Sequence, residues 1–158
     1  MDLNKQYNKA SYLSYKLNNE YFAINVNSVV EIMELPQLTI VPNTSEHIKG
    51  VLNFRGEIVP VINMHKRFNL NSDDDNTGMV IIINFETNDS QMHLGLMVDE
   101  VSSVIEFKMK DIRNIPDMGI NYNSDFLIGM IEMEEKFMMI LNIDNVFNLE
   151  DLAECEVA

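Results

Sequence analysis

The stretch GVLNFRGEIVPVINM, residues 50–64, decides the organisation of this chain, because an altered copy of it, GMIEMEEKFMMILNI, occupies residues 129–143. The leading glycine, the apolar positions and an asparagine near the end coincide, whereas the turn between the apolar runs differs. Such self-similarity predicts two similar lobes rather than a solenoid, which needs at least three units. Further segments match in the same order, 22–33 with 94–105 and 13–17 with 81–85.

Short apolar runs bounded by turn residues fill most of the chain, and many alternate with period two. This pattern is typical of a mainly β protein built from barrels or sandwiches. Arg55 and Gly56 separate two of the runs and predict a tight hairpin, because glycine accepts the positive φ that such a turn needs. The expected strands are 12–17, 21–26, 51–54, 57–62, 80–85, 92–98, 101–107, 126–133 and 137–143.

Few helices are expected. Ser28 and Glu31 have the spacing of a capping box, which predicts a short helix there, and a counterpart is expected near Asp99. A last helix is predicted from Asp144 through Leu152, because the apolar residues of that segment fall on one stripe.

Length and charge limit the classes of function. A chain of 158 residues can bury one sizeable core, and a single cysteine, Cys155, permits no disulfide framework within the chain. The beginning of the chain lacks a continuous apolar stretch, so neither a signal peptide nor a membrane span is expected. A net charge of −14 repels nucleic acid phosphates and anionic lipid, which leaves proteins or cations as the expected partners.

One segment opposes this acidic background. Between residues 49 and 67 stand four cationic side chains and one acidic one, Glu57. We call this segment the positive island and expect it to dock an acidic partner. Its cations are Lys49, Arg55, Lys66 and Arg67.

An acidic loop raises a metal hypothesis. Asp73 and Asp75 occupy positions 1 and 3 of a calcium-loop template. Position 12, however, is Asn84 rather than a bidentate glutamate, and the residues after the loop predict a strand instead of a helix. The simpler alternative, a solvated turn, fits these residues better.

Other chemistry-bearing patterns are missing from the sequence. It has no G-x-S-x-G context, no P-loop and no G-x-G-x-x-G after a strand. The histidines stand far apart, without a carboxylate or cysteine at a metal-ligand interval: His47, His65 and His93. We therefore expect no catalytic residue, no cofactor and no metal, with an acidic metal-dependent hydrolase using Asp73 and Asp75 as the opposing hypothesis.

The two copies of the opening motif differ at the hairpin. Glu134 replaces Arg55 and Glu132 replaces Asn53 in the second copy. The lobe does not need an arginine at this place, so Arg55 is either a solvated hairpin residue or a five-donor fork for a carboxylate or amide of a partner.

The same residues carry a resemblance to a known family. G-x-x-N-x-R-G-x-I-V-P-V at residues 50–61 resembles the signature of the CheW family of chemotaxis coupling proteins. The segment 29–32 is similar to the family's V-x-E-I helix, 95–104 to its G-I-x-V-D-x-V-x-x-V and 126–129 to its aromatic-L-x-G. The resemblance covers residues 12–152 in order.

This resemblance implies a fold. It is a mainly β CheW-like domain over residues 10–153, with two pseudo-symmetric five-stranded SH3/OB-like β-barrel lobes around a shared core, few short helices and a C-terminal helix. The sequence repeats cover about 11–68 and 79–147, and exchanged segments mean that lobe boundaries need not follow them. Residues 1–9 and 154–158 are expected to be flexible tails.

The resemblance also implies a function. It is that of a stand-alone, non-enzymatic adaptor that couples the cytoplasmic tips of chemoreceptors (methyl-accepting chemotaxis proteins) to the regulatory domain of the histidine kinase CheA and assembles the signalling array. Such a protein is cytoplasmic and is recruited to membrane-associated receptor arrays, without inserting into the membrane itself. A CheW-type scaffold for a non-chemotactic pathway is the alternative that the sequence leaves open.

Family equivalence places the partner surfaces as well. The receptor tip is expected near the groove between the lobes, and the kinase at the ends of the barrels. The implied receptor-binding residues are Val29, Glu31, Arg55, Met79, Gly95, Val101 and Val104; the implied kinase-binding residues are Lys49, Gly50, Arg113 and Met118.

Overall fold

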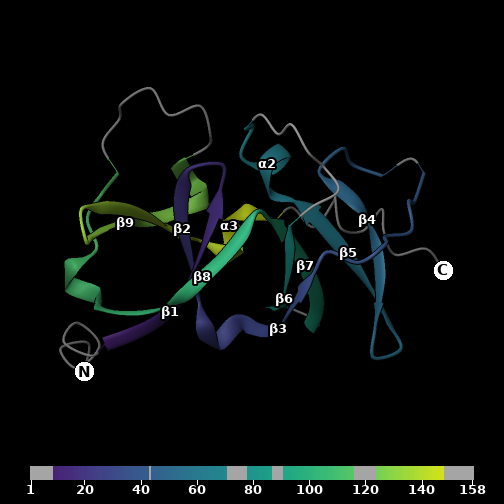
Figure 1. The fold of residues 1–158 in the computed structure, drawn as a ribbon, viewed down its shortest axis with the longest axis horizontal. Helices are drawn as coiled ribbons and strands as arrows, with labels where there is room; N and C mark the ends of the chain where they lie inside the picture. The colour runs from purple at the N-terminus through teal and green to yellow at the C-terminus, as the bar shows by residue number, and fades with distance from the viewer. Residues whose placement is uncertain (1–8, 43, 71–77, 87–90, 116–123, 148–158) are drawn as a thin grey trace.

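The computed structural model describes residues 9–42, 44–70, 78–86, 91–115 and 124–147. Within them, ten strands form two five-stranded sheets (Figure 1). The strands are β1 (Lys9–Leu17), β2 (Glu20–Asn25), β3 (Val29–Glu34), β4 (Ile48–Phe54), β5 (Glu57–Asn63), β6 (Met79–Glu86), β7 (Gln91–Val98), β8 (Glu100–Lys108), β9 (Leu127–Met133) and β10 (Lys136–Leu141).

Strand order shows how the two repeats combine. The first lobe is the sheet β8-β1-β2-β10-β9, and the second lobe is the sheet β3-β6-β7-β5-β4. Strands β1 to β5 come from the first repeat and β6 to β10 from the second, so each sheet takes two strands from one repeat and three from the other. Among the described strands each sheet has one parallel contact, β10 with β2 and β5 with β7, and the two contacts occupy equivalent places.

The predicted fold class, mainly β with two similar five-stranded lobes, is confirmed. In the described part of the chain, no ladder joins the edge strands β8 and β9 of the first lobe, or β3 and β4 of the second. The lobes are therefore open sheets rather than closed barrels.

The core lies in three places because the central strands are covered on both faces. The largest apolar cluster fills the space between the sheets, where Tyr15 and Phe22 of the first lobe meet Ile81 and Leu96 of the second. Each lobe also has its own small cluster on the other face of its sheet. Continuous apolar runs such as residues 79–83 follow from this arrangement, since a strand buried on both faces has no polar side.

The helix predicted at Ser28 to Glu31 is wrong. A single 3-10 turn, η1 (Val26–Ser28), is capped by the Asn25 side chain, which accepts from the Asn27 N–H. Residues from Val29 onward are extended and pair with β6 as strand β3. The counterpart expected near Asp99 is likewise a strand, β8. Valine and isoleucine favour a pleated, half-buried surface, and pairing with another strand outweighs a local capping pattern.

The last helix is shorter than predicted within the described residues. Helix α3 (Ile143–Val146) makes one turn and ends at Phe147, whose backbone is extended. The rest of the predicted helix, residues 148–152, lies outside the described residues, as do most of the predicted tails. A second short helix, α2 (Met64–Arg67), begins at Asn63, whose side chain accepts from the backbone N–H groups of His65 and Lys66.

Candidate docking surfaces

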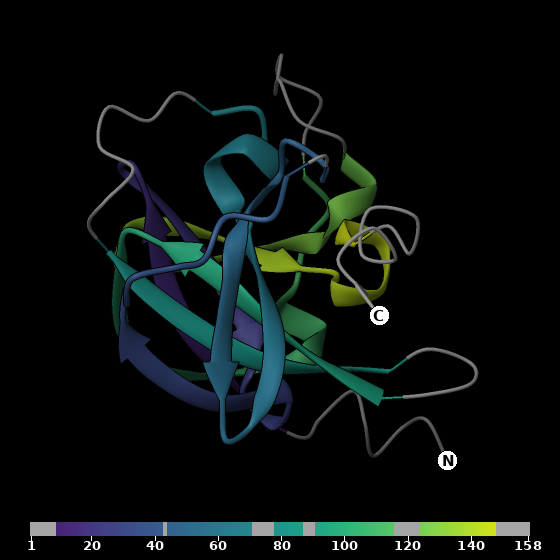
Figure 2. The ribbon, with the colours of Figure 1, turned by 90° about the vertical axis from the view of Figure 1, so that its right-hand side faces the viewer.

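The β4–β5 hairpin carries the residues that distinguish the two copies of the repeated motif. Arg55 and Gly56 both have positive φ, +52° and +83°, as a two-residue type I′ turn requires. Asn53 accepts a hydrogen bond from the Gly56 N–H through Oδ1 at 3.0 Å. Asn53 and Gly56 therefore build the turn, and the long side chain of Arg55 projects from it. Figure 2 shows the hairpin, drawn in blue to teal, with its turn at the bottom of the view.

Two contacts hold Arg55. Its Nη2 lies 3.5 Å from Oε2 of Glu31 on β3, and its Cζ lies 4.7 Å from the centroid of the Phe54 ring. The Arg55 side chain is 69% exposed and that of Glu31 41%, so solvent screens the ion pair strongly. Two of the predicted receptor-binding residues, from strands far apart in sequence, are thus brought together, and most of the guanidinium faces solvent.

An open groove of about 490 Å³ lies where the edge strands β3 and β8 approach one another. Met79 and Val101, both predicted to bind the receptor, line it together with carboxylates from both lobes. The groove therefore has apolar surface flanked by negative charge. Its lining residues are Glu34, Leu35, Gly78, Met79, Asp99, Glu100 and Val101.

The remaining predicted receptor residues differ in accessibility. Val104 on β8 is 55% exposed, whereas Val29, at the start of β3, is half-buried against the core between the sheets. Gly95 is buried in β7, and a Cβ there would lie 3.0 Å from Val80 and 3.1 Å from Val61. A substitution at Gly95 would therefore act through the packing of the second lobe.

Asp99, which the sequence indicated only as the place of an expected short helix, links the groove to the interior. Its Oδ2 lies 2.9 Å from Nε2 of His65, which is 3% exposed, and accepts from the Asn18 N–H at 2.6 Å. The Asp99 N–H donates to the carbonyl of Lys16. These bonds tie helix α2 and the β1–β2 turn to the crossing between the lobes. Only the spatial pairing of His65 with a carboxylate reveals this role, since 34 residues separate them.

The predicted kinase-binding residues fall at two ends of the molecule. Lys49, half-buried, and Gly50, buried, are on β4 of the second lobe, whereas Arg113 is exposed beside β9 of the first. β4 and β9 lie at opposite ends of the long axis in Figure 1. Met118 lies outside the described residues.

The repeated glycine has a structural explanation in both lobes. Thr39 pairs with Val51, the residue after Gly50, and Arg113 pairs with Met130, the residue after Gly129. A Cβ at Gly50 would lie 2.7 Å from the Thr39 carbonyl oxygen, and a Cβ at Gly129 would lie 2.6 Å from that of Arg113. Each glycine lets a crossing segment approach the sheet, so Gly50 shapes the surface around Lys49 without offering a side chain itself.

Each of the two ends of the molecule that carry predicted kinase-binding residues also has an exposed apolar side chain. Ile58 on β5 is 66% exposed, and Phe137, the equivalent residue of the first lobe, is 54% exposed. The sequence did not identify them as surface residues, because their places in apolar runs resemble those of core residues.

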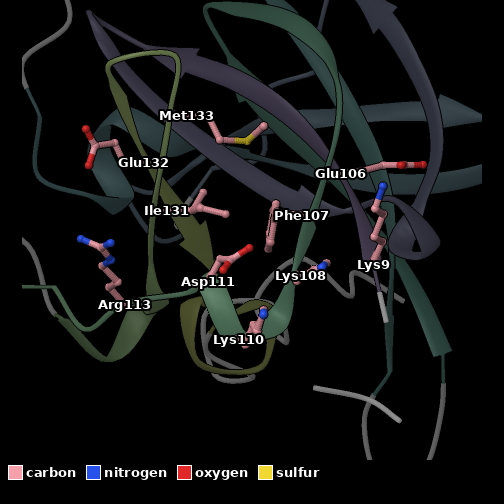
Figure 3. A pocket seen from close by; sticks show the side chains of 10 residues that line it. All are labelled: Lys9, Glu106, Phe107, Lys108, Lys110, Asp111, Arg113, Ile131, Glu132 and Met133. Atoms are coloured by element: carbon pink, nitrogen blue, oxygen red, sulfur yellow. The ribbon is translucent and has the colours of Figure 1, made fainter. Parts of the chain in front are cut away.

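A second open groove, also of about 490 Å³, lies beside Arg113 (Figure 3). It occupies the gap between the edge strands β8 and β9, with the buried side chains of Phe107 and Ile131 among its lining. Cations and carboxylates alternate around it, so its net charge is small. The charged lining residues are Lys9, Glu106, Lys108, Lys110, Asp111, Arg113 and Glu132.

The positive island is not a single patch. Arg55 lies at the turn of the hairpin, whereas Lys66 and Arg67 are on α2, at the opposite end of β5 (Figure 2). The Arg67 guanidinium lies 4.7 Å from the Phe126 ring centroid, and its Nε donates to the Val146 carbonyl. Arg67 thus connects the lobes internally, and the expectation of one basic docking surface is wrong.

A tyrosine flanked by lysines stands on the first lobe. The ammonium groups of Lys16 and Lys136 lie 4.9 and 4.8 Å from the Tyr21 ring centroid. Hydrogen bonds from Lys136 and Lys16 lower the pKa of the Tyr21 hydroxyl, and Tyr21 in turn raises the pKa of Lys16.

The described residues hold neither a metal-binding cluster nor a membrane-spanning helix. No group of three or more His, Cys, Asp or Glu side chains is arranged to hold a metal ion there. The acidic loop with Asp73 and Asp75 lies outside them. No helix in the described ranges has the length and apolar character to cross a membrane.

Comparison with known proteins agrees with this architecture. The family model for the CheW-like domain matches residues 11–151. The chain is 33% identical over 144 residues to the chemotaxis protein CheW of Klebsiella aerogenes, covering 90% of this chain and 84% of that protein. It is 28% identical to the chemotaxis protein CheW of Treponema pallidum, covering 89% and 83%. The crystal structure of the scaffolding protein TtCheW from Thermoanaerobacter tengcongensis superposes with a TM-score of 0.76 at 26% identity, covering 89% of each chain. Sequence, fold and the repeated motif together show that this chain belongs to the CheW-like domain family.

Proposed function

We propose that this chain is a non-enzymatic chemotaxis adaptor that couples the cytoplasmic tips of chemoreceptors to the regulatory domain of the histidine kinase CheA. The observation that carries the proposal is the placement of Arg55, on a rigid turn in one lobe only, with the guanidinium exposed and Glu31 beside it. An adaptor acts by binding rather than by chemistry, and it needs surfaces that two partners can occupy at once.

The receptor tip is assigned to the surface that joins Arg55 and Glu31 to the groove between β3 and β8. Glu31 and the groove residue Glu34 stand three residues apart on the edge strand β3, so their side chains leave opposite faces and the assigned surface runs around that edge. Val101 and Val104 extend it along β8. The kinase is assigned to the ends of the molecule, at Lys49 and Ile58 in the second lobe and at Arg113 in the first. In this arrangement the protein is cytoplasmic and joins membrane-associated arrays through the receptors.

Reconstitution tests the coupling itself. A receptor cytoplasmic fragment and the kinase are combined with and without this protein, and kinase autophosphorylation is measured. The proposal expects receptor-dependent activation only when the protein is present. Full activation without it would overturn the coupling role.

Arg55→Glu tests the receptor surface. The variant should melt within a few degrees of the wild type, because the side chain is exposed, and should abolish receptor-dependent activation. If Arg55 is a binding hot spot, truncation to alanine weakens receptor binding by about 2 kcal/mol, roughly thirtyfold. Lys66→Glu, which makes the same charge change at the other end of β5, is the matched control and should leave receptor affinity unaltered. Equal affinities for wild type and Arg55→Glu would remove Arg55 from the interface.

A further inference from the structure

Arg55 rests on an aromatic ring that is itself held from the neighbouring strand. Phe54, whose ring lies under the Arg55 guanidinium, is 7% exposed. Its ring meets that of His93 on β7 at 87°, with 5.9 Å between the centroids. Phe54 also packs in the apolar cluster of the second lobe, and an edge-to-face contact of this kind favours one orientation of its ring. The plane of that ring determines where a cation above it can lie.

His93 is fixed in turn by Glu57. Nδ1 of His93 lies 2.6 Å from Oε2 of Glu57. Because a carboxylate oxygen accepts, the Nδ1–H group of His93 donates this hydrogen bond. Glu57 is the first residue of β5 and pairs across the hairpin with Phe54. The contacts therefore form a continuous path of five side chains over β3, β4, β5 and β7. In order they are Glu57, His93, Phe54, Arg55 and Glu31.

In the first lobe, the counterparts of Glu57 and His93 also connect the hairpin to the central strand, but through a different kind of contact. Lys136 is the counterpart of Glu57 in the repeat, and Tyr21 is the counterpart of His93. The Lys136 ammonium lies 4.8 Å from the Tyr21 ring centroid. A contact between the hairpin and the central strand thus recurs in both lobes. In the first lobe, however, Met133 and Glu134 replace Phe54 and Arg55, so no aromatic ring carries the contact on to a cation.

We infer that Glu57 and His93 are positioning residues that orient Phe54 and, through its ring, aim the Arg55 guanidinium at the receptor. This inference rests on the proposed receptor role of Arg55. Neither residue needs to touch the partner: their effect passes through Phe54. An arginine with a long flexible stem loses rotamer freedom on binding, and a prearranged side chain reduces that cost.

A double-mutant cycle tests the coupling. The probe is a soluble cytoplasmic hairpin fragment of a chemoreceptor, titrated calorimetrically against wild type, His93→Ala, Arg55→Ala and the double variant. His93→Ala should weaken binding by about fivefold in the wild-type background, the size expected for one aromatic contact. It should add nothing in the Arg55→Ala background, because its effect requires Arg55. Equal losses in both backgrounds would overturn the inference, since they would mean that His93 acts independently of Arg55.

Nuclear magnetic resonance of the free protein separates failure of the inference from failure of the proposed function. The Arg55 Hε resonance, assigned by its loss in Arg55→Lys, reports the ring current of Phe54. His93→Ala should move it toward the position of an unstructured arginine, whether or not Arg55 binds a receptor. An unmoved resonance would overturn the positioning role. If Arg55→Ala leaves receptor affinity unchanged, the receptor role of Arg55 is wrong, and the resonance alone decides whether Glu57 and His93 position Arg55.

Three variants, with Glu57→Lys as a reference, separate the contribution of the hydrogen bond from that of the ring and control for a simple loss of folding. His93→Asn places an amide near Nδ1 and keeps the bond to Glu57 without the ring, whereas His93→Phe keeps the ring without the bond. Each should retain part of the wild-type ring-current shift. The double variant Glu57→Lys with His93→Tyr copies the pair of the first lobe and should restore receptor affinity to within about threefold of wild type. Failure of this pair to improve on Glu57→Lys alone would contradict the equivalence of the two lobes.

Discussion

Tyr15 is fully buried between the two sheets, where its ring stacks on Phe22 with 5.7 Å between the centroids. Its hydroxyl has no hydrogen-bond partner among the described residues. A buried polar group without a partner costs about 1 to 3 kcal/mol, whereas the ring itself stabilises the core. Tyr15 is therefore a residue at which the natural sequence is less stable than a simple alternative.

Tyr15→Phe should raise the free energy of unfolding by about 1 kcal/mol at neutral pH, because it removes the hydroxyl and keeps the ring. The gain should grow in alkali. Burial raises the pKa of Tyr15 above its ordinary value of 10.0. Ionisation of this phenol therefore does not affect the stability of the wild type below pH 10. Above pH 10 the phenol ionises only in the unfolded state, so the free energy of unfolding of the wild type falls as the pH rises. Urea melts at pH 8, 10 and 11 measure both effects. If the difference in free energy of unfolding between wild type and Tyr15→Phe is the same at pH 8, 10 and 11, the predicted growth of the gain at high pH is wrong.

The sequence predicted part of the candidate site at this scale. The predicted tight turn at Arg55 and Gly56 is confirmed. It could be predicted because the requirement for positive φ is local, and a glycine between two strands indicates such a residue. The neighbours of Arg55 could not be predicted from the turn. Glu31 is 24 residues away from Arg55 in the sequence and lies near it because β3 pairs with β6. His93, which lies nearby on β7, belongs to the other repeat.

Among the elements, the two hairpins make the same turn from different residues. Glu134 and Glu135 have φ of +52° and +65°, close to the values at Arg55 and Gly56, but without a glycine. The left-handed region costs a non-glycine residue about 1 to 2 kcal/mol. The β9–β10 turn holds two non-glycine residues in this region and the β4–β5 turn only one, Arg55, so the β9–β10 turn carries the greater strain.

Glu135→Gly should stabilise the protein by about 1 kcal/mol, because it gives the β9–β10 turn the residue that its backbone requires. Gly56→Glu is the reciprocal change and should destabilise by about the same amount, through the backbone alone, since a Cβ at Gly56 meets nothing within 4 Å. Thermal melts of both variants at one pH provide the measurement. A destabilised Glu135→Gly would show that the glutamate side chain makes a contact that outweighs the strain.

Strand prediction succeeded where the signal is local and failed at β3. Nine of the ten strands coincide with predicted apolar runs, although a helix was also expected at the start of β8, whereas β3 was predicted only as a helix. The capping-box spacing of Ser28 and Glu31 overlaps its start and its six residues alternate little, so propensity alone leaves the choice open. Pairing with β6, which belongs to the second repeat, decides it. The local sequence of β3 does not encode that pairing.

The whole molecule is held together by exchange of strands between the repeats. Strands β3 to β5 leave the sheet of β1 and β2, and β8 to β10 leave the sheet of β6 and β7. The largest apolar cluster lies between the sheets and takes residues from both. The repeats predicted two similar lobes and their order along the chain, but repeat spacing carries no information about which sheet a strand joins.

A single cooperative unfolding transition is therefore expected, despite two lobes with separate small cores. Leu52→Ala in the second lobe and Ile131→Ala at the equivalent place in the first should each cost about 3 kcal/mol. Both should lower the Tm of one shared transition, by roughly 6 to 12 °C. Differential scanning calorimetry checks this, with equal calorimetric and van't Hoff enthalpies as the criterion. A variant that splits the transition into two would show that the lobes unfold separately.

The strand exchange also bears on ancestry. A chain with one copy of the repeat would supply β1 and β2 to one sheet and β3 to β5 to another, and could complete neither sheet alone. Two such chains related by a two-fold axis would complete both, as a domain-swapped homodimer. The stability of that dimer would depend on protein concentration, whereas a gene fusion removes the dependence. Fusion also frees the two halves to diverge, so that an arginine can appear on one hairpin and a glutamate on its mate, a difference that a symmetric dimer of identical chains cannot encode.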